Sequence, residues 1–208
     1  MNAKDYFDHI APDWDHLQSM FFSPAVREKA FILAGVKKGQ LAADVGAGTG
    51  YVTTGLLEHG LQVIAVDQSS AMLDVMREKF AGNQDVEFRK GDVLQLPIED
   101  NSIDYVFANM VLHHLPQPLM GLREMIRILK PSGKLVITDI DKHDLEFLRH
   151  EQHDVWLGFE RDDIHAWFAE TGLQQVRVES TGEQCSSESC TGGEKAQISI
   201  FVAIGEKA

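Results

Sequence analysis

The sequence predicts an α/β fold in which a mostly parallel sheet is covered by helices on both faces. Three observations lead to this prediction. Short apolar runs alternate with helical segments from residue 41 to residue 139, the pattern of a parallel sheet with helical crossovers. A glycine-rich turn separates the first apolar run from the helix after it. The last two strand-like runs have no helix between them, so they are expected to pair as an antiparallel hairpin.

Helices are predicted within the first 35 residues. Between residues 3 and 20, apolar side chains recur at three- and four-residue spacing, which indicates a helix, and Pro12 implies a break or a fresh start. Ser23 followed by Pro24 is typical of a helix start, with a serine cap and proline at the first helical position. This second helix is expected to run to about Ala34.

Alternating strands and helices are expected in the middle of the chain. Ser69 or Ser70 is expected to cap the second of these helices. The predicted strands are Leu41–Val45, Gln62–Val66, Val86–Lys90, Ile103–Ala108 and Lys134–Asp139. The predicted helices are Tyr51–His59, Ala71–Phe80 and Pro118–Leu129.

The last third of the chain departs from this alternation. Residues 145–152 and 161–171 are predicted helices, and Gly172 is expected to end the second. Two strands follow, Gln175–Glu179 and Gln197–Ile204. The segment between them, 180–195, is rich in Gly, Ser, Glu and Cys and is expected to be a loop.

Composition narrows the class of protein. A chain of 208 residues with 44% hydrophobic and 25% charged residues is expected to form one domain. With 19 basic and 32 acidic residues, the net charge of −13 disfavours nucleic-acid binding, which depends on Lys and Arg. No stretch approaches the ~18 apolar residues of a membrane span, and the N-terminus lacks a signal-like apolar run. We therefore expect a cytoplasmic protein without membrane insertion.

The run from Asp44 to Gly50 indicates a cofactor loop. Gly46, Gly48 and Gly50 follow the strand at two-residue spacing, with Ala47 between the first two. Glycine permits a tight turn and close approach of a ligand to the backbone, and the next helix offers unpaired N–H groups. A dinucleotide fingerprint needs its third glycine one residue later, so it fits poorly.

Side chains after the next strands suggest how a nucleoside would bind. Asp67 ends the second strand, where a carboxylate can accept hydrogen bonds from both ribose hydroxyls, with Gln68 beside it; helix capping is the alternative. Met72 is expected either to pack on a purine face or to fill the core. Asp92 and Val93 follow the third strand and are expected to read the adenine edge, although the pair also suits an ordinary turn.

Candidate catalytic residues follow the fourth and fifth strands. Asn109 ends the fourth strand, at the sheet edge where ligands bind in open parallel sheets. His113 is a candidate base or positioning group, with a structural histidine as the alternative; next to it, His114 is expected to point about 100° away on a helical turn. After the fifth strand, His143 is a second catalytic candidate, with Asp139 and Asp141 as weaker ones.

Together these segments resemble the class I S-adenosylmethionine-dependent methyltransferases, nearest to the small-molecule branch that includes ubiquinone/menaquinone-biosynthesis-type C-methyltransferases. The matching pieces are 7–15, 44–50, 67–73, 91–92, 112–116 and 129–133.

The resemblance implies a Rossmann-like sheet of seven strands in one domain. It implies S-adenosyl-L-methionine as cofactor, bound within residues 40–140, and a small-molecule acceptor. Residues 1–35 would form a helical lid, in which Phe7 and Trp14 partly cover the cofactor, and residues 141–208 would supply substrate-side helices and the closing hairpin. A homodimer is left open.

Three alternatives stay open at this point. Cys185 and Cys190 are five positions apart and suit a metalloid- or thiol-directed methyltransferase, although two unremarkable thiols explain them as well. A nucleotide-dependent oxidoreductase would use a similar sheet. A non-catalytic protein would keep the cofactor pocket without turnover. No resident metal site is predicted, because the histidines at 150 and 153 lack zinc-protease spacing.

Overall fold

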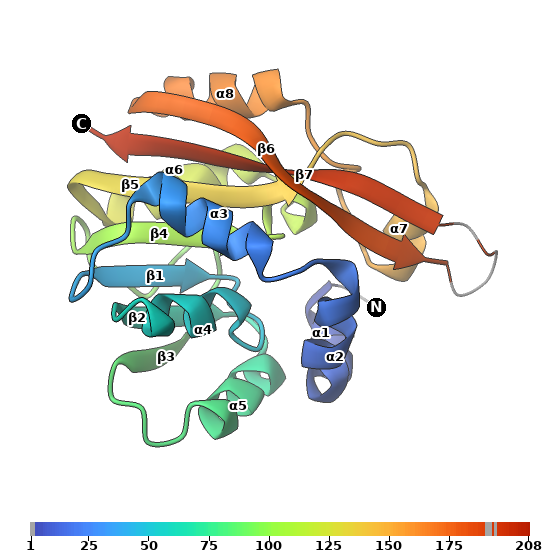
Figure 1. Ribbon diagram of the computed structural model, residues 1–208, viewed down its shortest axis with the longest axis horizontal. Coiled ribbons are helices and arrows are strands. Elements are labelled where there is room, and N and C mark those ends of the chain that lie inside the picture. The colour runs from blue at the N-terminus through green and yellow to red at the C-terminus, as the bar shows by residue number, and fades with distance from the viewer. Residues whose placement is uncertain (1–2, 190–192, 194) are drawn as a thin grey trace.

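The computed structural model describes residues 3–189, 193 and 195–208. Its centre is a seven-stranded sheet in the order β3-β2-β1-β4-β5-β7-β6, in which every neighbouring pair from β3 to β5 is parallel and β7 is antiparallel to both of its neighbours (Figure 1). This arrangement confirms the predicted fold class, including the antiparallel closing pair. The strands are β1 Leu41–Val45, β2 Gln62–Asp67, β3 Val86–Lys90, β4 Ile103–Asn109, β5 Leu129–Ile140, β6 Leu173–Glu188 and β7 Lys195–Lys207.

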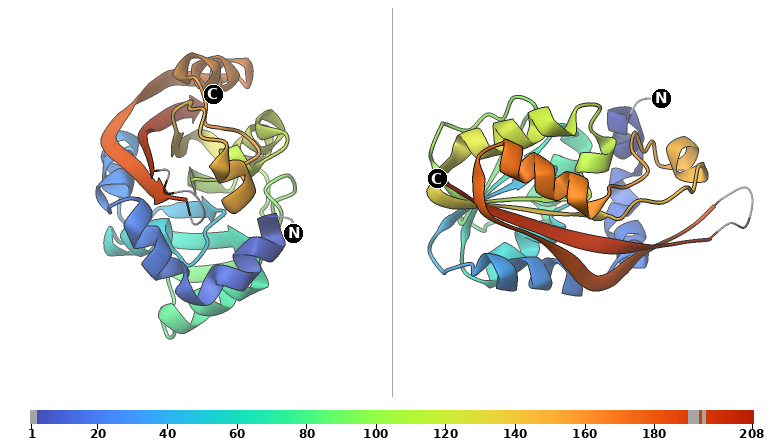
Figure 2. Two further views of the ribbon diagram at one scale, coloured as in Figure 1. Left: turned by 90° about the vertical axis from the view of Figure 1, so that its right-hand side faces the viewer. Right: turned by 90° about the horizontal axis from the view of Figure 1, so that it is seen from above.

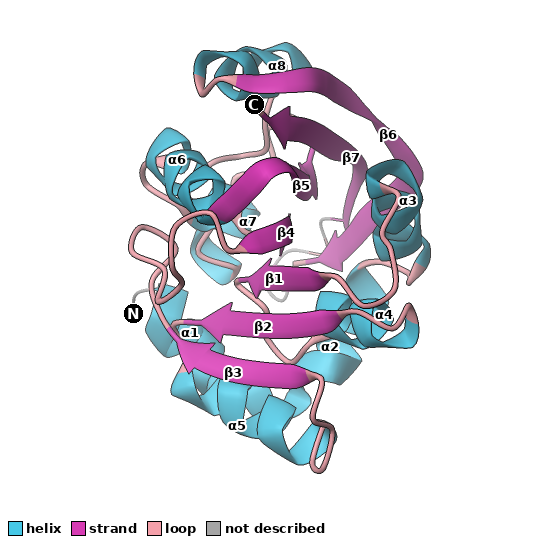
Figure 3. Cartoon of the chain, turned by 90° about the vertical axis from the view of Figure 1, so that its left-hand side faces the viewer, coloured by secondary structure: helices cyan, strands magenta, loops and turns pink. Residues whose placement is uncertain are grey.

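Helices cover both faces of the sheet (Figure 3). On one face lie α3 (Ala25–Ala34), α4 (Tyr51–Glu58) and α5 (Ser70–Lys79), and on the other lie α6 (Pro118–Ile128) and α8 (Arg161–Glu170). The apolar strand residues divide by alternation. Ala43 and Val45 join the α6 and α8 side, whereas Ala42 packs with α3 and α4. The core is therefore two layers, one on each side of the sheet.

The chain order reverses at β1, whose neighbours are β2 and β4. In open parallel sheets ligands bind at the carboxyl ends of the strands beside such a reversal. Two N-terminal helices, α1 (Ala3–Ile10) and α2 (Trp14–Phe21), lie across this end, joined by the short helix η1 (Ala11–Asp13) that contains Pro12 (Figures 1 and 2). Beyond β5, the short helix α7 (Phe147–Glu151) lies at the same end.

The prediction of a loop over residues 180–195 is wrong for residues 180–188 and for Lys195, which form strand. β6 continues to Glu188 and β7 begins at Lys195, and the pair stays in register from Gln184 opposite Ser199 to Glu188 opposite Lys195. A register shift between Ser180 and Gln184 bends the hairpin. The polar, glycine-containing sequence forms strand because each half pairs with the other, a preference that local composition does not carry.

None of the helices in the described part of the chain combines the length and the apolar character needed to cross a membrane.

Candidate active site

One cavity lies at the carboxyl end of the sheet and joins most of the predicted site residues. Its lining comes from the turns after β1, β2, β3 and β4, from the N-terminal helices, and from α7 with the outer parts of β6 and β7. The predicted residues in this lining are Asp44, Gly46, Ala47, Gly48, Asp67, Gln68, Met72, Asp92, Val93, Asn109 and His113. The fold therefore gathers into one place residues that are 69 positions apart in the chain.

The glycine loop closes tightly against its neighbours. Gly46 and Gly48 have φ values of 70° and 56°, a region that side chains rarely adopt. A Cβ on Gly46 would lie 2.5 Å from Val111 Cγ2, and one on Gly48 would lie 3.2 Å from Trp14 Nε1. Both neighbours also line the cavity, so the absence of side chains keeps the space above the loop open.

Gly50 has a different task. It precedes α4 with a φ of 94°, and a Cβ there would lie 2.7 Å from the ring of Phe80. Within the described residues the cavity lining does not include Gly50. Its requirement for glycine comes from the turn and from packing against α5, so the structure does not place it against a cofactor.

Asp67 is held in a fixed orientation at the end of β2. Oδ2 accepts a hydrogen bond from Gly48 N and Oδ1 accepts one from Ser69 N, both at 2.8 Å. Burial raises the pKa of this carboxyl, while the two backbone donors counteract the rise. Each oxygen keeps a further lone pair, so the carboxylate can accept two more hydrogen bonds. A vicinal diol such as a ribose supplies two such donors.

Asp44 is almost completely buried, at 1% exposure, beneath the glycine loop. Its Oδ2 accepts hydrogen bonds from the backbone N–H and the hydroxyl of Thr53 at 2.9 and 2.6 Å. Burial raises the pKa of Asp44 to about 7, although the Thr53 hydrogen bonds counteract it. The carboxyl therefore ties β1 to α4 and also places an ionisable group in the cavity lining.

The residues expected to contact a purine also line this cavity. Met72 is 1% exposed, so it packs in the core, and it also lines the cavity; its contact with a purine stays a prediction. Asp92 accepts a hydrogen bond from Leu94 N through Oδ1 at 2.8 Å, which fixes the turn after β3. Val93 and Gln68 complete this part of the lining.

The N-terminal helices are tied to the cofactor loop by polar contacts. Asp15 accepts hydrogen bonds from the Thr49 hydroxyl and from Lys79 Nζ. Ser69, the N-cap of α5, donates its hydroxyl hydrogen bond to Asp8 at 2.6 Å. Trp14, the first residue of α2, lies above Gly48 because α1 and α2 are both anchored to the turns beneath them.

His113 lies at the far end of the cavity on the short helix η2 (Leu112–His114), after Asn109. Its Nδ1 is 2.7 Å from Oδ1 of Asp139, a carboxylate with no exposed surface that also accepts from Leu112 N. Burial alone would lower the pKa of His113, but the charge and the hydrogen bond of Asp139 outweigh it and raise the pKa. Asp139 thus fixes the ring, and Nε2 is the nitrogen left for other partners.

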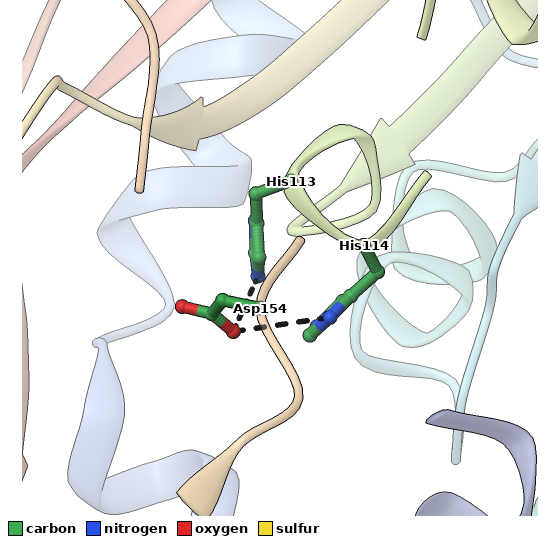
Figure 4. Close-up of side chains that lie close together, drawn as sticks. All are labelled: His113, His114 and Asp154. Carbon is green, nitrogen blue, oxygen red and sulfur yellow. Dashed lines mark ion pairs between the residues drawn. The ribbon is translucent and has the colours of Figure 1, made fainter. Parts of the chain in front are cut away.

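The expectation that His113 and His114 point apart is wrong. The two ring centroids are 4.1 Å apart, and both rings approach Asp154, which belongs to the loop after α7 (Figure 4). Residues 112–114 form a single 3-10 helix at the carboxyl end of β4, and the side chains of His113 and His114 both point toward the loop that contains Asp154. Burial, reinforced by the charge of His113, lowers the pKa of His114 well below its ordinary value.

His143 is not placed in this cavity. It lines a second hollow with residues of β7, and its Nδ1 accepts a hydrogen bond from Leu145 N at 3.2 Å. After β5 the chain turns outward at Asp141, which pairs with Arg161 of α8 at 2.6 Å. His143 is not among the described residues that line the main cavity, so its expected catalytic role stays a prediction without geometric support.

Cys185 lies in β6 and lines the main cavity. Burial, and then the charges of Asp154 and Asp139, raise the pKa of its thiol to about 12, which disfavours the thiolate that a metalloid site needs. Cys190, its partner in that hypothesis, lies outside the described residues.

Sequence reasoning missed the contribution of the last third of the chain. Asp154 had no signal, because an aspartate after a short helix is ordinary in any loop. Leu148 and Ile198 also line the cavity, although the sequence assigned them only to a helix and a strand; Cys185 lines it too, whereas the sequence offered it only as a metalloid or thiol site. Their role arises only when β6 and β7 extend over the carboxyl end of the sheet.

Comparison with known proteins gives consistent similarities. Residues 43–137 match the family described as Methyltransferase domain. A demethylmenaquinone methyltransferase of Staphylococcus aureus (strain JH9) is 37% identical over 206 residues, covering 84% of this chain and 86% of the relative. A demethylmenaquinone methyltransferase of Clavibacter sepedonicus is 37% identical over 111 residues, covering 53% of this chain and only 45% of that relative. The solved structure of a SAM-dependent methyltransferase from Aquifex aeolicus has a TM-score of 0.66 at 25% identity, covering 91% of this chain and 92% of that one.

Proposed function

We propose that this chain, which belongs to the class I S-adenosylmethionine-dependent methyltransferases of the quinone-biosynthesis type, methylates a small, flat, largely apolar acceptor. S-adenosylmethionine is its cofactor. The observation that carries the acceptor proposal is the cavity itself. One end has the glycine loop and Asp67, and the other has His113 among the apolar side chains of Ile140, Leu148 and Ile198.

The residues present fit this cofactor. The bare backbone at Gly46 and Gly48 leaves space that a Cβ would fill, and Asp67 keeps two lone-pair positions for a ribose diol. Asp92 and Met72 also line the cavity, and in this proposal they hold the adenine edge and face. When bound, the cofactor supplies an electrophilic methyl group, so the protein needs mainly to align the acceptor and exclude water.

We propose that α1 and α2 act as the lid of this single domain. Trp14 lies over Gly48, and Phe7 packs edge-on against both Trp14 and His114, at centroid separations of 5.4 and 5.3 Å. The aromatic residues thus span from the cofactor end to the acceptor end. Such a cover would keep water away from the reacting methyl group.

His113 is the proposed catalytic residue at the acceptor end. Asp139 holds Nδ1, so Nε2 is the atom that can engage the acceptor. The relatives are named for demethylmenaquinone, and a reduced naphthoquinone has the flat apolar ring and the polar oxygens that this end of the cavity suits.

Two measurements test the proposal. In a thermal-shift titration, S-adenosylhomocysteine should raise the melting temperature, whereas NADH should not, because only a ligand of the folded state stabilises it. Label from methyl-labelled S-adenosylmethionine should then appear in reduced demethylmenaquinone, and His113→Ala should lower kcat while leaving S-adenosylhomocysteine affinity unchanged. Binding without label in this acceptor or in an extract of small metabolites would favour a non-catalytic cofactor-binding protein.

The cytoplasmic location and the homodimer stay predictions for the whole chain. Cell fractionation tests the first, and sedimentation equilibrium tests the second.

A further inference from the structure

Three side chains converge at the acceptor end of the cavity: His113, His114 and Asp154, here called the His-His-Asp cluster (Figure 4). Nε2 of His113 and Nδ1 of His114 each lie 3.8 Å from the same atom, Asp154 Oδ1. One ligand atom from each residue lies within 4.8 Å of the other two. Both imidazoles therefore approach the same carboxylate oxygen, and Nδ1 of His114 also lies 3.5 Å from the carbonyl oxygen of His153, a contact that a bound cation would replace.

Asp154 carries the second, independent observation. Its side chain is only 2% exposed, and among the described residues no group donates a hydrogen bond to Oδ1. A buried carboxylate oxygen without a donor is costly, because it has lost its water and gained nothing in exchange. A cation placed between this oxygen and the two imidazoles would remove that cost.

We propose that His113 Nε2, His114 Nδ1 and Asp154 Oδ1 bind a divalent transition-metal cation. Imidazole and carboxylate are the donors that such cations take, and three protein ligands leave a position open on the metal. Ligands about 2.1 Å from a tetrahedral metal are about 3.4 Å from one another. Shifts of a few tenths of an ångström would close the two 3.8 Å separations, and the two imidazole nitrogens, which lie within 4.8 Å of one another, would approach by up to about 1.4 Å.

The surroundings match a metal site more closely than a proton relay. A relay needs hydrogen bonds, and 3.8 Å is too long for one. By contrast, the bond of 2.7 Å from Nδ1 of His113 to Asp139 is the outer contact that metal-bound histidines usually make. Asp139 would orient the ring and direct Nε2 to the metal.

The open position would face the cavity that all three residues line. Its ligand there would be water or an oxygen of the acceptor, a consequence that rests on the proposed function, whereas metal binding itself does not. In this arrangement His113 engages the acceptor through the metal. An acceptor with two adjacent oxygens, or one phenolate-like oxygen, suits such a position.

Metal titration of the whole chain tests the proposal. After treatment with a chelator and its removal, calorimetry with Zn²⁺ alone should show one site per chain. Asp154→Asn and His114→Gln should each abolish it, and Asp139→Asn should weaken it by roughly 10- to 100-fold. The matched control is His165→Ala, which removes an exposed histidine of α8 and should leave Zn²⁺ affinity unchanged.

Co²⁺ supplies a second readout, since its visible absorption should strengthen on binding to wild type and to His165→Ala but not with Asp154→Asn or His114→Gln. Each variant is included only after it binds S-adenosylhomocysteine with wild-type affinity, which shows that the domain is folded. Failure of wild type to bind Zn²⁺, or equal binding by Asp154→Asn, would overturn the metal site. Either result would leave the methyl-transfer assay to judge the proposed function separately.

Discussion

Replacing Asp44 by asparagine should stabilise the cofactor-free protein, and more so as the pH rises. Asp44 is buried at 1% exposure, and burial raises the pKa of its carboxyl from 3.8 to about 7. Among the described residues, only Thr53 donates hydrogen bonds to this carboxyl, both to Oδ2. The folded protein therefore binds a proton at Asp44 more tightly than the unfolded chain does.

The size and sign of the effect follow from that difference. Below about pH 4 the carboxyl is protonated in both the folded and the unfolded state, so its burial does not lower the free energy of unfolding. Above about pH 4 the Asp44 carboxyl ionises in the unfolded chain before it ionises in the folded protein. The free energy of unfolding therefore falls as the pH rises and becomes constant above about pH 7. The full difference corresponds to at most about 4 kcal/mol, of which about 3 kcal/mol falls between about pH 5 and pH 8.

Urea unfolding at about pH 5 and pH 8, without cofactor, measures this difference. Asp67 and Asp154 also have raised pKa values and add to the decline of the wild type, so the informative quantity is the wild type minus Asp44→Asn. That difference should change with pH, becoming more negative as the pH rises from about 5 to about 8. Equal pH dependence in wild type and Asp44→Asn would show that Asp44 is not a buried charge.

Three further predictions concern the cofactor end of the cavity. Asp67→Asn should weaken S-adenosylhomocysteine binding by about 1.5–3 kcal/mol in calorimetry, because a charged acceptor of hydrogen bonds is lost; unchanged affinity would exclude ribose binding. Gly46→Ala should lower the free energy of unfolding by about 1–3 kcal/mol, and adding Val111→Ala should recover part of it by relieving the 2.5 Å contact while the positive φ remains; no recovery would refute the steric account. Asp15→Ala should speed cofactor release in stopped flow by loosening the lid, while the exposed Asp13→Ala should not; equal rates in both would argue against a lid.

The cofactor end could be predicted because its signals are local. The turn after β1 has two left-handed positions that favour glycine, and the sequence shows glycine at both, Gly46 and Gly48. Asp67 follows from its place at the end of an apolar strand. Each such residue is adjacent in sequence to the element that positions it. Periodicity and turn chemistry therefore carry both the element and the side chain.

The acceptor end could not be predicted in the same way. Asp154 meets His113 across 41 positions of chain, and nothing in the spacing of either residue refers to the other. The extension of β6 to Glu188 has the same cause, since its residues are polar and become strand only by pairing with β7. Long-range pairing decides both features.

Binding of the cofactor and binding of the acceptor depend on different elements of the fold. The cofactor loop rests on backbone geometry and on Asp44 and Asp67, which are fixed by neighbours in the sheet. Besides His113 and Ile140, the acceptor end is lined by side chains from α7, β6 and β7, elements that lie outside the parallel part of the sheet. Substitutions at Leu148 or Ile198 can therefore reshape the acceptor space without altering the contacts of the glycine loop. Acceptor preference is expected to change through these elements while affinity for the cofactor is retained.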